Sequence, residues 1–247
     1  TEEEVLSIEG KIGLPLVLKA DGLAAGKGVI ICNDKLELNE AIDDMIYSKK
    51  FGLSSAKISV EECLKGEELS VFAICDGENY KIINSAQDHK RIFDNDKGPN
   101  TGGMGAYSPT PLFDDNLKVK VENSILKPIL AAMASEGHPF NGFLYIGLMI
   151  VDNNPYVIEF NVRLGDPEAQ VLLPLINSSF LDMILSSING SLNQYELALS
   201  SKYAVVIVLA AKGYPNKYPK GMEIVGLEKL KNNILFHAGT EINEDKV

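Results

Sequence analysis

KADGLAAGKGV, residues 19–29, combines lysines with closely spaced glycines, as many phosphate-binding loops do. The P-loop has the pattern G-x-x-x-x-G-K-[ST] and leads directly into a helix. In this stretch Asp21 stands at the position of the first glycine and Gly28 at the position of the hydroxyl residue. The residues that follow, Val29 to Cys32, are mostly β-branched and favour a strand over a helix. The sequence therefore predicts a glycine loop between two strands.

The bulk composition is that of a soluble globular protein with an acidic surface. The chain has 247 residues, of which 45% are hydrophobic, a formal net charge of -11 and a pI near 4.8. Because nucleic-acid binders usually carry a basic stripe, this charge argues against that class.

The widely spaced cysteines predict neither a zinc site nor a disulfide framework. This cysteine usage favours a reducing compartment, so we expect a cytoplasmic protein. No apolar run reaches the about 18 residues of a membrane span, and the first residues, Thr1 to Glu4, do not resemble a signal peptide. The missing initiator methionine suggests a piece of a longer chain.

Residues 1–62 are predicted to form a small sheet with a helix. Leu36 to Tyr47 has apolar residues at helical spacing, and Asp34 is a suitable N-cap. The expected strands are Leu14 to Lys19, Gly28 to Cys32 and Ile58 to Glu62.

Beyond residue 62 the sequence predicts hairpins and helices. The turn Asp76-Gly77-Glu78-Asn79 indicates an antiparallel hairpin. Residues 94–111 are rich in Asp, Asn, Gly and Pro and are expected to form a long loop, a kind that is usually functional or disordered. Pro128 is expected to bend its helix, and the loop 213–221 to begin a new unit. The predicted strands are 69–74, 80–86, 143–151, 156–161 and 203–210, and the predicted helices are 115–135, 167–176 and 180–188.

Polar groups are concentrated at the end of the strand that contains Glu159. Alternation along a strand puts Glu159, Asn161 and Arg163 on one face. A carboxylate and an amide oxygen suit Mg²⁺, and arginine offers a bidentate fork for phosphate or carboxylate. The ordinary alternative is a strand with one solvated face. The following Gly-Asp-Pro-Glu turn, which adds Asp166 and Glu168, favours the cation site.

Two other polar clusters admit both a functional and an ordinary interpretation. The segment Val60 to Glu68 could be a hinge whose backbone reads an adenine edge and whose later carboxylate binds a ribose, or it could be a solvated strand end. Gln87 to Arg91 and the glycine-rich stretch Gly98 to Pro109 could bind an anion through side chains and backbone amides, or form a basic turn and a linker. His138 and His237 have no ligand-like neighbours and are expected to be structural.

Taken in order, these motifs are more informative than any one of them. KADGLAAGKGV, QDHKR (87–91), GPNTGGMGAYSP (98–109) and VIEFNVRLGDPE (157–168) closely resemble the phosphoribosylamine-glycine ligase family, the glycinamide ribonucleotide synthetases of the ATP-grasp superfamily. The resemblance covers nearly the whole chain, begins inside the family's pattern and stops soon after Phe236 to Thr240.

The resemblance implies an α+β ATP-grasp fold, in which two α+β subdomains with antiparallel sheets sandwich ATP. Residues 1–62 would be the small lid subdomain, residues 63–195 the large subdomain with the metal and substrate site, and residues 196–247 the start of a C-terminal domain. The family's N-terminal domain would be absent.

The resemblance also implies a role for each matching residue. Lys19 would contact the α- and β-phosphates, and the Gly22 to Gly28 loop would close over the β- and γ-phosphates. Many ATP-grasp enzymes carry a further metal-binding carboxylate where this chain has Gly147. The implied ATP-binding residues are Lys19, Gly26, Lys27, Gly28, Glu61, Glu62, Leu64 and Glu68. The implied metal ligands are Glu159 and Asn161, and the implied catalytic cations are Lys19 and Arg163. The implied substrate-binding residues are Asp88, His89, Lys90, Arg91, Asn100, Thr101, Gly102, Gly103, Arg163, Asp166 and Glu168.

The implied reaction joins glycine to 5-phosphoribosylamine through glycyl phosphate, with ATP as phosphoryl donor and Mg²⁺ or Mn²⁺ as cofactor. The partners would be small molecules only, with no nucleic acid or membrane, and the protein would be a monomer. Two alternatives stay open: an ATP-grasp carboxylate-amine ligase with a different acceptor, and a non-catalytic ATP-binding module.

Overall fold

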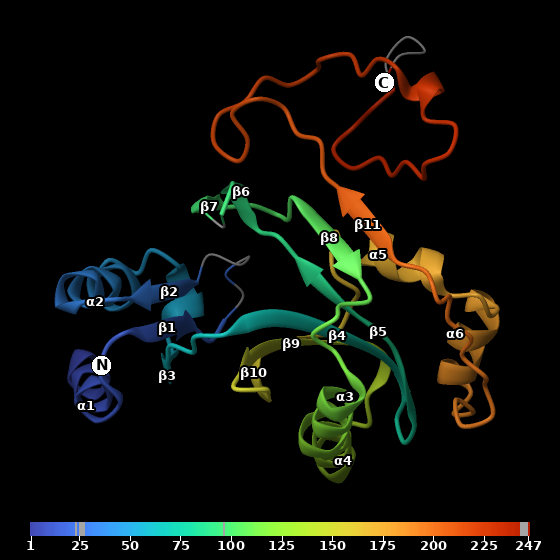
Figure 1. The fold of residues 1–247 in the computed structure, drawn as a ribbon. Coiled ribbons are helices and arrows are strands. Elements are labelled where there is room, and N and C mark those ends of the chain that lie inside the picture. The colour runs from blue at the N-terminus through green and yellow to red at the C-terminus, as the bar shows by residue number, and fades with distance from the viewer. Residues whose placement is uncertain (23, 25–27, 96, 243–246) are drawn as a thin grey trace. The chain divides into compact units, whose positions relative to one another are not determined.

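The computed structural model describes residues 1–22, 24, 28–95, 97–242 and 247. The chain divides into two compact units, Thr1–Lys65 and Gly66–Val247 (Figure 1).

The first unit is built on an antiparallel sheet with the strand order β2-β1-β3. Its strands are β1 (Leu16–Ala20), β2 (Val29–Cys32) and β3 (Ile58–Glu62). β1 and β2 pair directly, with Lys19 opposite Val29, so the predicted strands on either side of the glycine loop are confirmed. The loop residues Gly26 and Lys27 lie outside the described residues.

Helices cover one face of this sheet. They are α1 (Glu2–Ile12), α2 (Lys35–Ile42), the π-helical turn η1 (Asp43–Tyr47) and the 3-10 turn η2 (Gly52–Ser55). Asp34 is the N-cap of α2, as predicted: its carboxylate accepts hydrogen bonds from the Leu36 and Glu37 amides. α1 was not predicted, although Thr1 and Glu4 form a capping box at its start. The buried core between the helices and the sheet consists of Val5, Leu16, Leu18, Cys32, Leu38, Ala41, Ile42 and Met45.

The second unit contains a sheet with the strand order β10-β9-β4-β5-β8-β11. Its strands are β4 (Glu67–Asp76), β5 (Tyr80–Asp88), β8 (Gly105–Ser108), β9 (Asn141–Val151), β10 (Asn154–Asn161) and β11 (Ala204–Ile207). All pairings are antiparallel, and the two predicted hairpins, β4-β5 and β9-β10, are confirmed. β4 is buried on both faces, because Val71 and Ala73 pack into one core while Phe72 and Ile74 pack into another.

Each face of this larger sheet has its own helical cover (Figure 1). One layer runs from Asp115 to Ser135 as predicted, but a π-helical turn interrupts it just before Pro128. In the other layer, the helix predicted over residues 167–176 is shorter and begins only at Ala169. The helix Phe180–Ile188 agrees with the prediction. The helical elements are α3 (Asp115–Val121), η3 (Glu122–Leu126), α4 (Lys127–Ser135), α5 (Ala169–Leu172), η4 (Leu173–Leu175) and α6 (Phe180–Ile188).

The prediction of a long loop over residues 94–111 is partly wrong, because this stretch contains the strands Lys97–Asn100 and Gly105–Ser108. β6 (Arg91–Phe93) pairs with β7 (Lys97–Asn100), and β8 pairs with both β5 and β11. Small residues allow β8 to pack closely, and buried hydroxyls hold its end. The Ser108 hydroxyl donates to the Ser85 carbonyl at 2.7 Å, and the Ser85 and Thr110 hydroxyls lie 3.0 Å apart.

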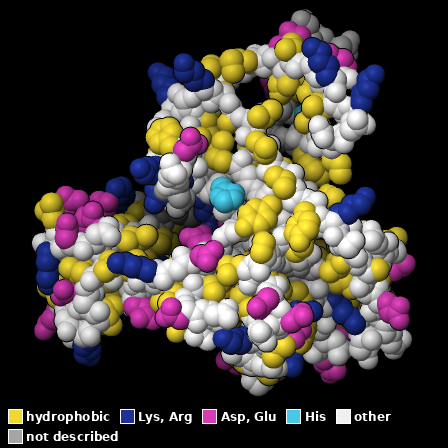
Figure 2. Space-filling view, in the orientation of Figure 1, with side chains coloured by type: hydrophobic (Ala, Val, Ile, Leu, Met, Phe, Trp, Pro, Cys, Tyr) yellow, Lys and Arg dark blue, Asp and Glu magenta, His cyan; other side chains and the backbone are white. Residues whose placement is uncertain are grey.

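After β11 the described residues carry little regular structure apart from the 3-10 turn η5 (Leu227–Lys229). Large hydrophobic side chains are exposed on β11 and beyond it, among them Val205, Ile207 and Leu209. Figure 2 shows hydrophobic side chains on the surface of the molecule. None of the described helices is long and apolar enough to cross a membrane.

We expect Asp76 to be a strong stabilising residue of the second unit. Its buried carboxylate accepts hydrogen bonds from the Glu78, Asn79 and Leu192 amides at 3.1, 2.6 and 3.0 Å. Burial opposes the charge, but these hydrogen bonds prevail and lower the pKa of Asp76. Asp76→Ala should therefore lower the free energy of unfolding by about 2–3 kcal/mol, measured by thermal or urea denaturation.

The exposed Glu78 in the same turn provides the control, since Glu78→Gln should change stability little. Because the folded-state pKa of Asp76 is depressed, its stabilisation is present above the ordinary carboxyl pKa. It is lost as the pH falls through the folded-state pKa. A stability difference between wild type and Asp76→Ala that stays constant into strong acid would contradict this assignment.

Candidate functional site

In the first unit the candidate site residues lie on the sheet face opposite the helical core. Lys19 and Glu61 project from the neighbouring strands β1 and β3, and Lys19 Nζ lies 2.6 Å from Glu61 Oε2. The lysine side chain is 21% exposed and the glutamate 42% exposed, so both reach the surface. The two residues for which the family resemblance implied separate roles are thus held together as an ion pair. Glu62 ends β3, and Leu64 follows half-buried.

Exposed apolar side chains on the edge strand of this sheet were not predicted as site residues. Val29 and Ile31 of β2 are 51% and 50% exposed, and they stand opposite Lys19 and Val17 in the register. The sequence shows an uninterrupted apolar run along this strand. It does not show which face the helices would leave uncovered.

Gly28 marks a close approach of the chain at the end of the glycine loop. A Cβ atom there would lie 2.7 Å from the Ala24 Cβ and 3.0 Å from the Ala20 Cβ. The Gly28 carbonyl also accepts a hydrogen bond from the Ala20 amide at 2.8 Å. The position therefore favours glycine. Gly26 and Lys27, the other predicted loop residues, are not among the described ones.

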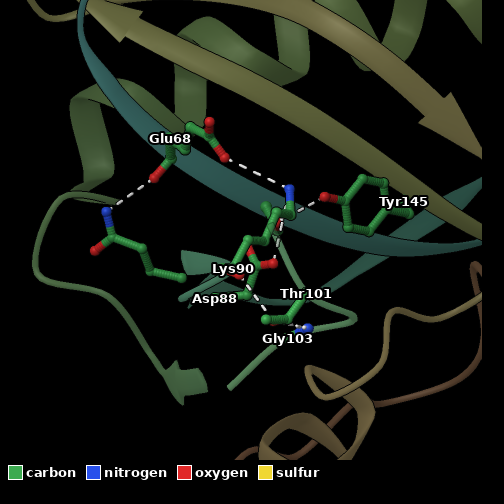
Figure 3. A network of polar contacts seen from close by, with 8 residues as sticks. Glu68, Asp88, Lys90, Thr101, Gly103 and Tyr145 are labelled. Atoms are coloured by element: carbon green, nitrogen blue, oxygen red, sulfur yellow. Dashed lines mark hydrogen bonds and ion pairs between the residues drawn. The ribbon is translucent and has the colours of Figure 1, made fainter. Parts of the chain in front are cut away.

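In the second unit Lys90 is the centre of a polar network (Figure 3). Its Nζ lies 3.5 Å from Glu68 Oε2 and 3.7 Å from Asp88 Oδ2. Burial opposes the charge on Lys90, but Asp88 and then Glu68 outweigh it and raise the pKa of the ammonium. The network thus holds a permanently charged lysine between two carboxylates.

A small cavity of about 80 Å³ adjoins this lysine. The Tyr145 hydroxyl accepts a hydrogen bond from Ser70 at 3.0 Å, and burial raises the pKa of this tyrosine to about 12. Tyr145 is therefore a neutral hydroxyl at physiological pH. The cavity is lined by Glu68, Leu69, Ser70, Lys90, Tyr145, Gly147, Leu148, Ile158 and Glu159.

Glu159 reaches this cavity because Gly147 leaves room for it. Gly147 pairs with Ser70 on one side and with Glu159 on the other. A Cβ atom at Gly147 would lie 3.2 Å from both Glu159 Cγ and Tyr145 Cε1. The glycine that stands where a carboxylate was expected is thus the neighbour that accommodates Glu159.

Asn161 ends the same strand, β10. Within the described ranges, no group of three or more His, Cys, Asp or Glu side chains could hold a metal ion.

The glycine-rich loop 101–104, between β7 and β8, is held by hydrogen bonds to other parts of the chain. The Thr101 amide and hydroxyl both donate to the Lys90 carbonyl, at 2.7 and 2.8 Å. The Gly103 amide donates to the Thr101 hydroxyl at 3.0 Å, and the Met104 amide to the His89 carbonyl at 2.7 Å. The Gly102 amide donates to the Tyr214 hydroxyl at 3.1 Å. Four consecutive amides that could bind an anion thus already have acceptors within the protein.

This loop and the motif after β10 meet at Gly103. Gly103 has φ +113°, and a Cβ atom there would lie 2.4 Å from Pro167 Cδ. Beside this contact Glu168 is only 3% exposed, and burial followed by the charge of Asp88 raises its pKa. A Cβ atom at Gly165 would lie 2.3 Å from Glu168 Oε2. Two motifs far apart in the sequence are therefore packed together.

The other predicted substrate residues lie at the edge of this arrangement. Arg91 donates to the Gly98 carbonyl at 2.6 Å, and Arg163 donates to the Leu164 carbonyl at 3.0 Å. Asp166 accepts from Gln170 at 2.7 Å. His89 is exposed and stacks on Tyr107, and Asn100 is exposed on β7. The structure thus brings Glu68, Lys90 and Glu159 together around one cavity, with Asp88 as a further ion-pair partner of Lys90. His89 and Asn100 stay at the surface.

Comparisons with known protein families agree with these motifs. Residues 2–169 match the family described as phosphoribosylglycinamide synthetase, ATP-grasp (A) domain, and residues 204–247 match its C domain. The chain is 44% identical over 245 residues to a phosphoribosylamine–glycine ligase of Caldanaerobacter subterraneus, covering 99% of this chain and 59% of that protein. It is 48% identical over 236 residues to the ligase of Halalkalibacterium halodurans, covering 95% of this chain and 55% of that protein. The chain thus spans little more than half the length of these curated relatives.

Solved structures show the same fold. The crystal structure of a phosphoribosylamine–glycine ligase from Thermotoga maritima superposes with a TM-score of 0.87 at 36% identity, over 100% of this chain and 61% of that one. The biotin carboxylase domain of a Hydrogenobacter thermophilus 2-oxoglutarate carboxylase superposes with a TM-score of 0.60 at 17% identity, over 83% of this chain and 43% of that one. The predicted α+β fold of ATP-grasp type is therefore confirmed, and the chain belongs to the phosphoribosylglycinamide synthetase family.

Proposed function

We propose that the protein containing this chain ligates glycine to 5-phosphoribosylamine, with ATP as phosphoryl donor, and so makes glycinamide ribonucleotide, ADP and phosphate for purine biosynthesis. One observation carries the proposal. The glycine-rich loop and the motif after β10 pack together at Gly103 and Pro167, beside Lys90, in a chain with 44% identity to a named phosphoribosylamine–glycine ligase. A purine-biosynthetic enzyme of this kind would act in the cytoplasm, and we expect a monomer.

The first unit is proposed to supply contacts to the nucleotide. Lys19 would contact the α- and β-phosphates, and Glu61 would accept a hydrogen bond from the adenine amino group. The ion pair between them supports this assignment, since the cation and the carboxylate share one sheet face with the exposed Val29 and Ile31. Such apolar side chains suit a flat base. The further proposed ATP contacts are Gly26, Lys27 and Gly28 to the phosphates, Glu62 and Leu64 to adenine through their backbone, and Glu68 to the ribose.

Glu159 and Asn161 are proposed to hold the divalent cation, with Mg²⁺ the first candidate and Mn²⁺ the second. Their oxygen donors fit a hard cation that keeps water or phosphate oxygens in its remaining positions. Gly147 supports this site, because it leaves space beside Glu159. When bound, the cation would neutralise charge on the transferred phosphoryl group.

The substrates are proposed to bind around Lys90. Asp88 and Glu68 keep it protonated, and its ammonium is proposed to donate to the carboxylate of glycine or to the phosphate of the sugar. Arg163 is exposed at the end of the same motif as Glu159 and is proposed as a second cation for the transferred group. The other residues proposed on the substrate side are His89, Arg91, Asn100, Thr101, Gly102, Gly103, Asp166 and Glu168.

The proposed reaction has two steps. A carboxylate oxygen of glycine attacks the γ-phosphorus of ATP, the bond from that phosphorus to the bridging oxygen breaks, and ADP leaves. The amine nitrogen of 5-phosphoribosylamine then attacks the carbonyl carbon of glycyl phosphate, phosphate leaves, and the nitrogen loses a proton. Neither step needs a nucleophilic side chain. Both need charge stabilisation and in-line positioning, which Lys19 and Arg163 are proposed to provide.

The test is phosphate release by the full-length protein. We expect rapid release from ATP only when glycine and 5-phosphoribosylamine are both present, because the acyl phosphate is consumed only by the amine. Omission of either substrate is the control. Equal turnover with a different carboxylic acid would instead indicate another ATP-grasp carboxylate-amine ligase. ATP binding with no turnover under any condition would indicate a non-catalytic module.

A further inference from the structure

The glycine-rich loop 101–104 makes hydrogen bonds to residues that precede it in the chain and to Tyr214, which follows it. Of its four consecutive amides, those of Thr101, Gly103 and Met104 donate to acceptors earlier in the chain: the Lys90 carbonyl, the Thr101 hydroxyl and the His89 carbonyl. The fourth, that of Gly102, donates to the Tyr214 hydroxyl, 112 residues further along the chain. Tyr214 lies in the part of the chain that matches the C domain of the family.

We propose that Tyr214 is a positioning residue for the substrate loop, and that through this loop it sets the position of Lys90. The inference rests on the proposed function, since it assigns Lys90 to substrate binding. Tyr214 lies outside every sequence motif from which the candidate site was predicted.

The path from Tyr214 to Lys90 is short and continuous. The Tyr214 hydroxyl fixes the Gly102 amide, and the adjoining Thr101 makes two hydrogen bonds to the Lys90 carbonyl. Gly103, on the other side of Gly102, packs against Pro167. A shift of Gly102 must therefore move either the contact to Lys90 or the contact to Pro167.

The space around Gly102 supports a specific fit. A Cβ atom there would lie 3.3 Å from the Tyr214 hydroxyl oxygen, which is closer than an ordinary van der Waals contact. The Tyr214 ring is itself supported by an edge-to-face contact with Tyr218, with ring centroids 5.6 Å apart. β11 leads into this segment, and the Val208 amide donates to the Met104 carbonyl at 2.9 Å. The hydroxyl is thus held at the loop by several contacts.

The experiment compares Tyr214→Phe with Tyr218→Phe in the full-length enzyme, because each replacement removes one hydroxyl from the same segment. Tyr214→Phe should raise the KM of one substrate by about three- to tenfold, the effect of one hydrogen bond, and leave the KM of ATP and the melting temperature nearly unchanged. The substrate affected, glycine or 5-phosphoribosylamine, should be the one whose KM rises most in Lys90→Met. Tyr218→Phe should behave as wild type.

A second pair of variants tests whether Tyr214 acts through Gly102. Gly102→Ala should raise the same KM, because the added methyl group pushes against the hydroxyl. In the Tyr214→Phe background the same alanine should add little, so the two effects should not be additive. Full additivity, or a Tyr214→Phe enzyme whose kcat alone is changed, would overturn the proposal. So would a lower KM, since the hydroxyl would then compete with substrate for the amide.

Hydrogen exchange separates failure of this proposal from failure of the proposed function. The peptide covering residues 97–104 should exchange faster in Tyr214→Phe than in wild type and Tyr218→Phe, whatever reaction the enzyme catalyses. Unchanged exchange would mean that the hydroxyl does not hold the loop. Faster exchange in a protein without glycine-dependent turnover would leave the positioning role intact and refute the ligase assignment.

Discussion

Glu159→Gln is expected to lower kcat/KM of the full-length enzyme by about 100-fold or more at ordinary magnesium concentrations. The replacement keeps the size of the side chain and one of its two oxygens, but it removes the negative charge. Because only Glu159 and Asn161 are proposed to bind the cation from the protein side, the loss of one charge should weaken the site severely. The measurement is initial rate against magnesium concentration, in which higher magnesium should recover part of the activity.

The control for Glu159→Gln is Glu136→Gln, which neutralises an exposed glutamate just after α4. It should have the rate and the magnesium dependence of wild type. If Glu159→Gln lost activity with an unchanged magnesium dependence, Glu159 would not be a metal ligand. If it kept full activity, the assignment of the strand end as the cation site would be wrong.

Local patterns in the sequence were sufficient to predict most elements of the fold. The strand Ile58–Glu62 and the helix Phe180–Ile188 agree with the prediction at both ends. The helix was well bounded in the sequence, because Ser179 caps its start and Asn189-Gly190 follow its end. The strands inside the predicted loop 94–111 were missed for the opposite reason. β7 contains glycine and proline, which local preference assigns to turns, and it exists through pairing with β6.

The candidate site was predictable as a set of residues but not as a set of contacts. The motifs predicted Lys90, Thr101 and Gly103 as candidate site residues. Nothing in their sequence indicated that the amides of the loop would be taken up by acceptors within the protein. The role of Tyr214 was equally hidden, because a contact across 112 residues depends on how β8 and β11 pair. Such pairings are set by the whole sheet and not by the local pattern.

Lys19→Met is expected to cut turnover of the full-length enzyme by about 100-fold or more while leaving its circular dichroism spectrum unchanged. Methionine keeps the length and the apolar part of the side chain and removes the charge proposed to contact the phosphates. The loss cannot be ascribed to the ion pair with Glu61 alone, since a partly exposed pair contributes at most about 1 kcal/mol to stability.

Lys35→Met is the matched control, because Lys35 makes an ion pair of the same 2.6 Å length with Glu9 in the same unit. If Lys19→Met and Lys35→Met both had the wild-type rate, Lys19 would be only a surface partner of Glu61. If Lys19→Met lost activity and Glu61→Gln mainly raised the KM of ATP, the two residues would have the separate phosphate and adenine roles proposed for them.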